Sequence, residues 1–169
     1  PGFGGSCFPK DTRAVSQIAQ ERGLQFHIID AVLDVNKITQ QRMVVKIREA
    51  LGGSISGKKV AALGLAFKAN TDDVRATPSL PILSALESEG AEIRAYDPEA
   101  MEEFRKDFEL DIEYCKDEYE AAEGADVLLI LTDWNQFRAL DFKRMSSLLT
   151  QNLVIDLRNL YDPSDVTQH

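Results

Sequence analysis

The fold class follows from one continuous apolar run, Asp126-Val127-Leu128-Leu129-Ile130-Leu131-Thr132. A run of this kind is typical of a central parallel strand that is covered on both faces. Two further runs, Lys59-Val60-Ala61-Ala62-Leu63-Gly64 and Leu153-Val154-Ile155-Asp156, predict more buried strands. Together the three segments favour a parallel sheet inside an α/β domain.

Strands and helices alternate around these runs. Further strands are predicted at residues 92–96 and 112–115, and helices at 77–90, 97–104, 117–122, 134–137 and 142–149. Since the connections are long enough for right-handed βαβ units, the pattern predicts a doubly wound, Rossmann-like parallel sheet. Ligands bind such sheets beyond the carboxyl ends of the strands. We therefore expect a binding rim formed by the loops after Ala66, Asp97, Thr132 and Asp156.

The first part of the chain predicts two helices. Apolar residues recur at helical spacing from Thr12 to about Arg22, and Gly23 stands where a C-terminal cap is expected. A long amphipathic helix follows over residues 26–51. Its apolar face carries Ile29, Val32, Leu33, Met43, Ile47, Ala50 and Leu51.

Two polar residues, Asn36 and Gln40, interrupt that apolar face. Such residues can fix the register of a helix that pairs with a partner, or they can be satisfied by local hydrogen bonds. We favour the first interpretation, which predicts a homodimer formed through the long helix. The glycine-rich stretch 52–57 then marks a boundary between a helical segment, 1–53, and an α/β domain, 54–169.

Composition excludes several classes of partner. The formal net charge of −9 argues against nonspecific binding to nucleic acid or to an anionic membrane surface. No apolar run approaches the roughly 20 residues that span a bilayer, and no signal peptide is recognisable, so we expect a cytoplasmic protein. Cys7 and Cys115 are far apart and lack partners of zinc-site spacing, which predicts free thiols and no metal site.

The most specific motif is Gly2-Phe3-Gly4-Gly5-Ser6-Cys7-Phe8-Pro9-Lys10-Asp11. Glycines allow close backbone approach to a ligand, and a cysteine just before a helix can have its thiolate stabilised by backbone amides and by Lys10. Such a cysteine could act as a nucleophile. From the residues alone, a glycine-rich linker with an inert thiol fits equally well.

A second motif follows the first predicted strand, Gly64-Leu65-Ala66-Phe67-Lys68-Ala69-Asn70-Thr71-Asp72-Asp73-Val74-Arg75. It lacks the second and third glycines of the dinucleotide-binding pattern GxGxxG. By itself it therefore indicates a strand followed by a polar loop rather than an NAD site. Asp97, at the end of the next strand, could be a ribose-binding acid, but Asp-Pro more simply caps the following helix.

Both motifs resemble those of the UDP-glucose/GDP-mannose dehydrogenase family. The resemblance implies that Cys7 attacks the C6 aldehyde produced by a first hydride transfer, giving a thiohemiacetal. A second oxidation then gives a thioester, which water hydrolyses. By the same resemblance Asp11 organises the hydrolytic water and Lys10 meets the cofactor, NAD. The segment Gly2, Phe3 and Gly4 then lies against the sugar nucleotide.

The later motifs carry over in the same way. The resemblance implies that Phe67 and Lys68 touch the sugar nucleotide and that Arg75 reaches the cofactor, since an arginine suits a pyrophosphate. Arg158, in the short motif Asp156-Leu157-Arg158-Asn159, corresponds to a family arginine that contacts substrate.

The family reaction is the NAD-dependent oxidation of a nucleotide sugar, and the cysteine motif is most similar to that of members acting on UDP-glucose. GDP-mannose and UDP-N-acetylmannosamine remain alternative substrates, and a noncatalytic nucleotide-binding and dimerisation module is the alternative function. In the family an NAD-binding domain precedes these segments. Because the chain opens at Pro1 without Met, we expect a part of a longer protein that is inactive alone.

Overall fold

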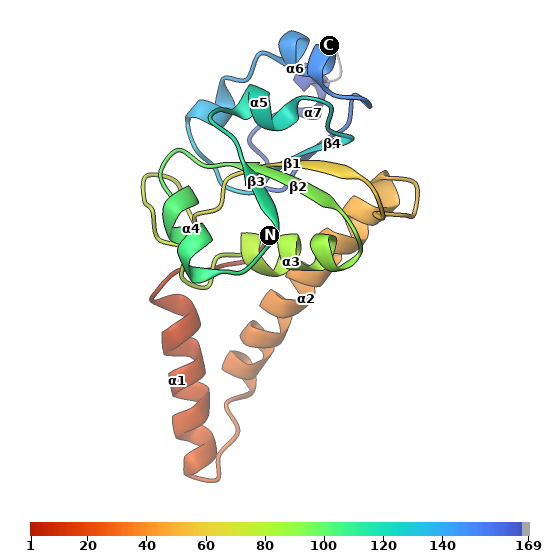
Figure 1. Cartoon of the computed structure of the whole chain (residues 1–169). Coiled ribbons are helices and arrows are strands. Elements are labelled where there is room, and N and C mark those ends of the chain that lie inside the picture. Colours follow the sequence, from red (N-terminus) through yellow and green to blue (C-terminus); the bar gives the residue numbers. More distant parts are fainter. Residues whose placement is uncertain (167–169) are drawn as a thin grey trace.

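The computed structural model describes residues 1–166, so the last three residues of the predicted domain 54–169 lie outside it. Two long helices extend from one side of an α/β unit (Figure 1). The elements follow in this order: α1 (Phe8–Glu21), α2 (His27–Ala50), β1 (Lys59–Leu63), α3 (Ser79–Ser88), β2 (Glu92–Tyr96), α4 (Met101–Asp107), β3 (Ile112–Tyr114), α5 (Glu118–Ala122), β4 (Val127–Ile130), the 3₁₀ helix η1 (Gln136–Arg138), α6 (Phe142–Leu148), β5 (Val154–Asp156) and α7 (Pro163–Val166).

The five strands form one parallel sheet in the order β3-β2-β1-β4-β5. Val60 of β1 lies opposite Ile93 of β2 and Val127 of β4, so the predicted apolar runs form the centre of the sheet. Every residue of β4 is buried, as its composition predicts. The predicted Rossmann-like α/β fold is confirmed.

Buried side chains cover both faces of the sheet. On one face the core includes Ile47 of α2, Leu83 of α3 and Phe104 of α4. On the other face it includes Ala121 of α5 and Met145 of α6. The order of strands places the change of winding between β1 and β4, where α/β sheets commonly bind ligands.

Helix α1 begins at Phe8, four residues earlier than the sequence pattern predicts. Pro9 occupies its first turn, where the missing N–H of proline costs no hydrogen bond. The predicted C-terminal cap is present: Gly23 has φ +71°, and the amide of Leu24 donates to the carbonyl of Ala19 at 3.0 Å.

Helix α2 belongs to two environments. Its C-terminal half packs on the α/β unit through Val44 and Ile47, and Arg48 forms an ion pair with Glu89 beyond α3. Its N-terminal half extends away beside α1 (Figure 1) and exposes apolar side chains, among them Ile28 and Val35. The predicted helix is confirmed, and the division of the chain at residues 53 and 54 remains a prediction.

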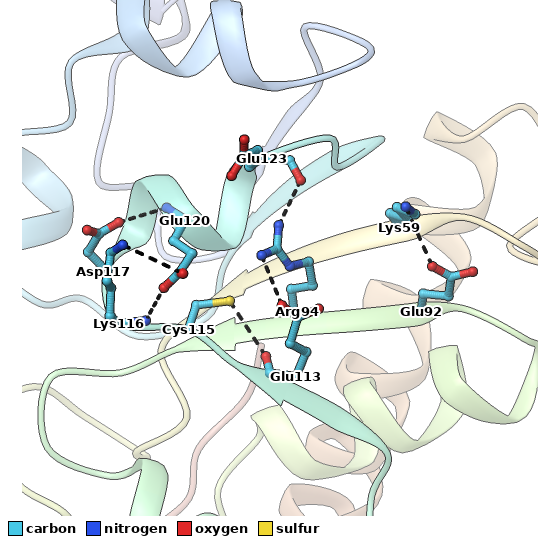
Figure 2. A network of polar contacts seen from close by, with 9 residues as sticks. All are labelled: Lys59, Glu92, Arg94, Glu113, Cys115, Lys116, Asp117, Glu120 and Glu123. Carbon is cyan, nitrogen blue, oxygen red and sulfur yellow. Dashed lines mark hydrogen bonds and ion pairs between the residues drawn. The ribbon is translucent and has the colours of Figure 1, made fainter.

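Arg94 connects strand β2 to its surroundings near one edge of the sheet (Figure 2). Its Nη1 donates to the carbonyl of Glu123 at 2.7 Å, and its Nη2 donates to Glu113 of β3 at 3.0 Å. The nearby Cys115 is a buried free thiol, and burial raises its pKa. Cys115 is therefore part of the core, as predicted. Within residues 1–166, no helix has the length and apolar character needed to cross a membrane.

Candidate active site

Residues 2–7, here called the cysteine loop, cross from helix α2 to the segment that follows β1. Phe3 exchanges two hydrogen bonds with the side chain of Asn36, at 2.8 and 3.1 Å. Two residues further on, the amide of Gly5 donates to the carbonyl of Arg75 at 2.9 Å. The loop is therefore fixed on both sides, by α2 and by the segment 64–78.

Two glycines of the motif are required by close packing inside the protein. A Cβ added to Gly4 would lie 2.4 Å from the carbonyl oxygen of Ala76. A Cβ added to Gly5, whose φ is +92°, would lie 2.7 Å from the ring of Phe67. The sequence analysis expected glycines to admit a ligand, whereas Gly4 and Gly5 admit the chain's own 64–78 segment.

Cys7 lies at the N-terminus of α1 with an exposed side chain. Its Sγ is 3.7 Å from the hydroxyl of Ser6. The first-turn amides of α1 lie directly beyond it, and helix N-termini favour negative charge. The described structure thus presents an exposed thiol at the N-terminus of a helix.

Lys10 and Arg75 are the two cations predicted to meet the cofactor, and Arg75 interacts electrostatically with Cys7. Its guanidinium forms a bidentate ion pair with Asp73, in which Nε donates to Oδ1 at 2.9 Å and Nη2 donates to Oδ2 at 2.7 Å. The hydrogen bond to Asp73 is the main reason why the pKa of Arg75 is raised, and a negative Cys7 adds to the effect. Lys10 lies with its Nζ 3.4 Å from Asp11, and both of these side chains are exposed.

Arg158 joins the carboxyl ends of β1 and β4. Its Nε donates to the carbonyl of Leu131 at 2.6 Å and its Nη2 donates to the carbonyl of Phe67 at 3.1 Å. Burial lowers the pKa of Arg158, and Asp133 opposes that effect. The side chain of Arg158 therefore fixes the position of Phe67. The sequence did not indicate this role for Arg158.

Lys68 lies over the ring of Phe67, with its Nζ 5.4 Å from the ring centroid. Lys68 is exposed and Phe67 is partly exposed. An aromatic face beside a cation can hold a base or a phosphate. The structure thus brings Phe67, Lys68, Arg75 and Arg158 to the same rim as the cysteine loop.

The crevice between β1 and β4 is filled by the chain itself and does not fit a dinucleotide. A Cβ added to Gly64 would lie 2.4 Å from the side chain of Thr132, whose hydroxyl donates to the carbonyl of Ala66 at 2.6 Å. Asp97 is fully buried and accepts a hydrogen bond from Nε1 of Trp134 at 3.2 Å. A ribose would have to displace these contacts, as the incomplete glycine pattern predicts.

Asp97 also caps the next helical turn. Its Oδ1 accepts the amides of Glu99 and Ala100 at 3.0 and 2.9 Å, and its Oδ2 accepts those of Leu65 and Ala66 at 2.7 and 3.1 Å. Helix α4 begins only at Met101, with Ala100 as its N-cap and no side-chain cap, so Asp97 binds the turn before the helix and not its first turn as predicted. Among residues 1–166, no three histidine, cysteine or acidic side chains are grouped so that they could hold a metal ion.

Asn36 does not have the register-fixing role that we favoured for it from the sequence. Its amide is used inside the chain, on the backbone of Phe3, so this polar position has the local partner of the second interpretation. Asp73 was not singled out as a site residue at all. An acid two residues before an arginine was the only available signal.

The fold of this chain is similar to part of several solved nucleotide-sugar dehydrogenases. The solved UDP-glucose dehydrogenase of Pyrobaculum islandicum superposes with a TM-score of 0.84 at 37% identity, covering 94% of this chain and 35% of that one. UDP-N-acetyl-mannosamine dehydrogenase Cap5O from Staphylococcus aureus superposes with a TM-score of 0.73 at 26% identity, covering 96% and 36%.

The chain belongs to the UDP-glucose/GDP-mannose dehydrogenase family. The UDP binding domain of that family matches residues 61–163, and its central domain matches residues 1–38. The UDP-glucose 6-dehydrogenase of Rhizobium meliloti is 46% identical over 169 residues, which are 100% of this chain and 38% of the relative. The enzyme TuaD of Bacillus subtilis is 44% identical over 160 residues, 95% and 34%. The chain thus spans little more than a third of these relatives.

Proposed function

We propose that this chain is the thiol-bearing and nucleotide-binding part of an enzyme that oxidises UDP-glucose to UDP-glucuronate with NAD. The observation that carries the proposal is the attachment of the cysteine loop to the 64–78 segment. The bond from Gly5 to Arg75 and the packing of Gly5 on Phe67 bring an exposed thiol to the rim of the UDP binding domain.

The proposed chemistry uses Cys7 as a nucleophile. NAD, when bound to the complete protein, would accept one hydride in each of two oxidations at C6. In the first, the C6 alcohol loses a hydride and its hydroxyl proton and becomes an aldehyde. The Cys7 thiolate attacks this aldehyde, and the resulting oxyanion takes up a proton to give a thiohemiacetal. In the second, the thiohemiacetal loses a hydride and its hydroxyl proton and becomes a thioester, and water then releases the carboxylate and the free thiol. We assign to Asp11, one helical turn beyond Cys7, the role of orienting that water.

The proposed substrate contacts lie along the rim. Lys68 and Phe67 suit a nucleotide, since a cation beside an aromatic face offers both charge and stacking. Arg158 acts mainly by holding Phe67, and the backbone of Gly2, Phe3 and Gly4 faces the sugar. The match to the UDP binding domain supports a UDP-sugar ligand.

The proposed contacts with NAD are the exposed cations Lys10 and Arg75. Because the crevice between β1 and β4 is filled, we assign no further part of this sheet to the cofactor. The apolar side chains that α2 exposes support a homodimer through that helix, with 1–53 as the helical segment and 54–169 as the UDP-sugar domain.

The test is to count the NADH that the complete protein releases per UDP-glucose, by absorbance. We expect two NADH per sugar with the wild type and at most one with Cys7→Ala, because the first hydride transfer precedes attack by the thiol. The control Cys115→Ala, whose thiol is buried, should leave the count at two. Two NADH from GDP-mannose or UDP-N-acetylmannosamine, and none from UDP-glucose, would identify that sugar as the substrate. Formation of UDP-glucuronate by Cys7→Ala would refute the assignment of Cys7 as the nucleophile.

A further inference from the structure

The side chain of Asn36 pairs with the backbone of the cysteine loop as a neighbouring strand would. Its Oδ1 accepts the amide of Phe3 at 2.8 Å and its Nδ2 donates to the carbonyl of the same residue at 3.1 Å. A carboxamide supplies one acceptor and two donors, so it can satisfy both backbone groups at once. A carboxylate could satisfy only the amide.

The residue before Phe3 is shaped to this contact. Gly2 has φ +95°, a conformation that side chains rarely adopt, and a Cβ added there would lie 2.5 Å from Oδ1 of Asn36. Gly2 is therefore a glycine because the amide of Asn36 approaches so closely. The close approach of Gly2 to Asn36 thus accompanies the two hydrogen bonds between Phe3 and Asn36.

The contact is also the wall between two cavities. One, of about 410 Å³, lies among α1, α2 and the start of α3, and the other, of about 580 Å³, lies on the more apolar side of α2. Phe3 and Asn36 line both of them. Phe3 also contacts Phe8 of α1, whose ring lies edge-on with the centroids 6.2 Å apart. The two hydrogen bonds to Asn36 are therefore the attachment of the loop to α2 at this point.

The opposite end of the loop is fixed differently. Gly5 is bonded to Arg75 and packed on Phe67, both in the α/β unit. The cysteine loop is thus held between two bodies, α2 at Phe3 and the α/β unit at Gly5, and Cys7 follows two residues later. The position of its thiol depends on both attachments.

We propose that Asn36 is a positioning residue for Cys7: its carboxamide fixes the cysteine loop to α2 and so sets where the thiol meets the sugar. This inference rests on the proposed function, in which Cys7 is the nucleophile. Asn36 itself touches no reacting atom. Its loss should therefore slow the thiol-dependent steps and leave binding of the nucleotide, at Phe67 and Lys68, unchanged.

The experiment compares Asn36→Leu, which removes both hydrogen bonds, with Asn36→Asp, which keeps the acceptor and removes the donor. Gln40→Leu is the matched control, because Gln40 lies one turn further along α2, lines the same first cavity and makes no hydrogen bond to the cysteine loop in the described structure. All three are made in the complete protein. Circular dichroism verifies that each variant is folded.

For both Asn36 variants we expect kcat to fall by about tenfold or more, with the Kd for UDP within about twofold of the wild type, because Phe67 and Lys68 hold the nucleotide. We also expect the rate at which iodoacetamide alkylates Cys7, followed by peptide mass spectrometry, to change in Asn36→Leu. Gln40→Leu should change neither quantity. Wild-type kcat and alkylation in both Asn36 variants, or equal losses in Gln40→Leu, would overturn the proposal.

The alkylation rate separates this inference from the proposed function. It reports the setting of the Cys7 thiol without any turnover. If Cys7→Ala still produced UDP-glucuronate, the assignment of Cys7 as the nucleophile would be refuted, yet an altered alkylation rate in Asn36→Leu would still support the positioning of the loop. If Cys7→Ala were inactive and the Asn36 variants behaved like the wild type, only the positioning role would fail.

Discussion

Asp97 shows how one side chain organises the rim. Its carboxylate is fully buried and accepts four backbone amides and the indole N–H of Trp134. Charge-assisted bonds of this kind are about twice as strong as neutral ones, and they offset the cost of burying the charge. The same bonds close the site where a dinucleotide ribose would bind.

Replacing Asp97 should therefore destabilise the fold more than replacing an exposed acid. Asp97→Ala would leave several buried donors without a partner, and we expect the free energy of unfolding to fall by about 3 kcal/mol or more. The control Asp107→Ala, at the exposed end of α4, should stay within about 0.5 kcal/mol. Urea denaturation followed by circular dichroism measures both.

The ion pair of Asp73 and Arg75 gives a prediction about pH. The hydrogen bond from Arg75 lowers the pKa of Asp73 from its ordinary value of 3.8. An acid with a lowered pKa stabilises the folded state above its unfolded pKa, and this stabilisation is lost as the pH falls through the folded pKa. The advantage of the wild type over Asp73→Asn should therefore be present at pH 6 to 7 and shrink below about pH 4. A difference that does not depend on pH would contradict the ion pair.

At the scale of elements, α2 combines a packed half with an exposed half. Ile47 is fully buried against the α/β unit, whereas Val35 is 60% exposed. The sequence pattern placed Val32 and Ile47 on one apolar face, but only the C-terminal half of that face meets the α/β unit within this chain. Hydrophobic periodicity shows which residues share a face, but it does not show what packs against the N-terminal half of that face.

Truncation at these two positions should separate the two halves. Ile47→Ala should lower the free energy of unfolding by about 2 to 4 kcal/mol, because it removes buried carbons and leaves a cavity. Val35→Ala should change it by no more than about 0.5 kcal/mol in the monomer. Equal effects would mean that α2 is packed along its whole length.

Sequence reasoning found the elements well where a local cause defines them. The apolar runs of β1 and β4 and the glycine cap after α1 each depend on neighbouring residues. The start of α1 and the partner of Asn36 were missed. Asn36 binds a residue 33 positions away, and no pattern within one helix reveals such a contact.

At the scale of the whole molecule, the exposed apolar side chains gather on α1 and α2. They include Phe8, Ile18, Leu24, Ile28, Val35 and Ile38, all at least half exposed. Apolar surface of this extent on helices that extend away from the α/β unit is typical of an interface (Figure 1). This surface supports the proposed homodimer through α2.

A charge placed on that surface should disrupt the dimer. We expect Val35→Asp to shift the complete protein from dimer to monomer in sedimentation velocity, because an unpaired carboxylate would be buried between the subunits. Val45→Asp, at an exposed position where α2 lies against the α/β unit, is the comparison within the same helix. If the Val35→Asp variant remained a dimer, the interface would not include this part of α2.

The central claim is that Cys7 carries the sugar during the reaction, and peptide mass spectrometry tests it most directly. The complete protein with Asp11→Asn, in which hydrolysis should be slow, is mixed with UDP-glucose and NAD and then quenched in acid. We predict a covalent UDP-glucuronyl adduct on the peptide that contains Cys7 and none on the peptide that contains Cys115. UDP-glucuronate formed at the wild-type rate by a Cys7→Ala variant, with no adduct on any peptide, would contradict the account.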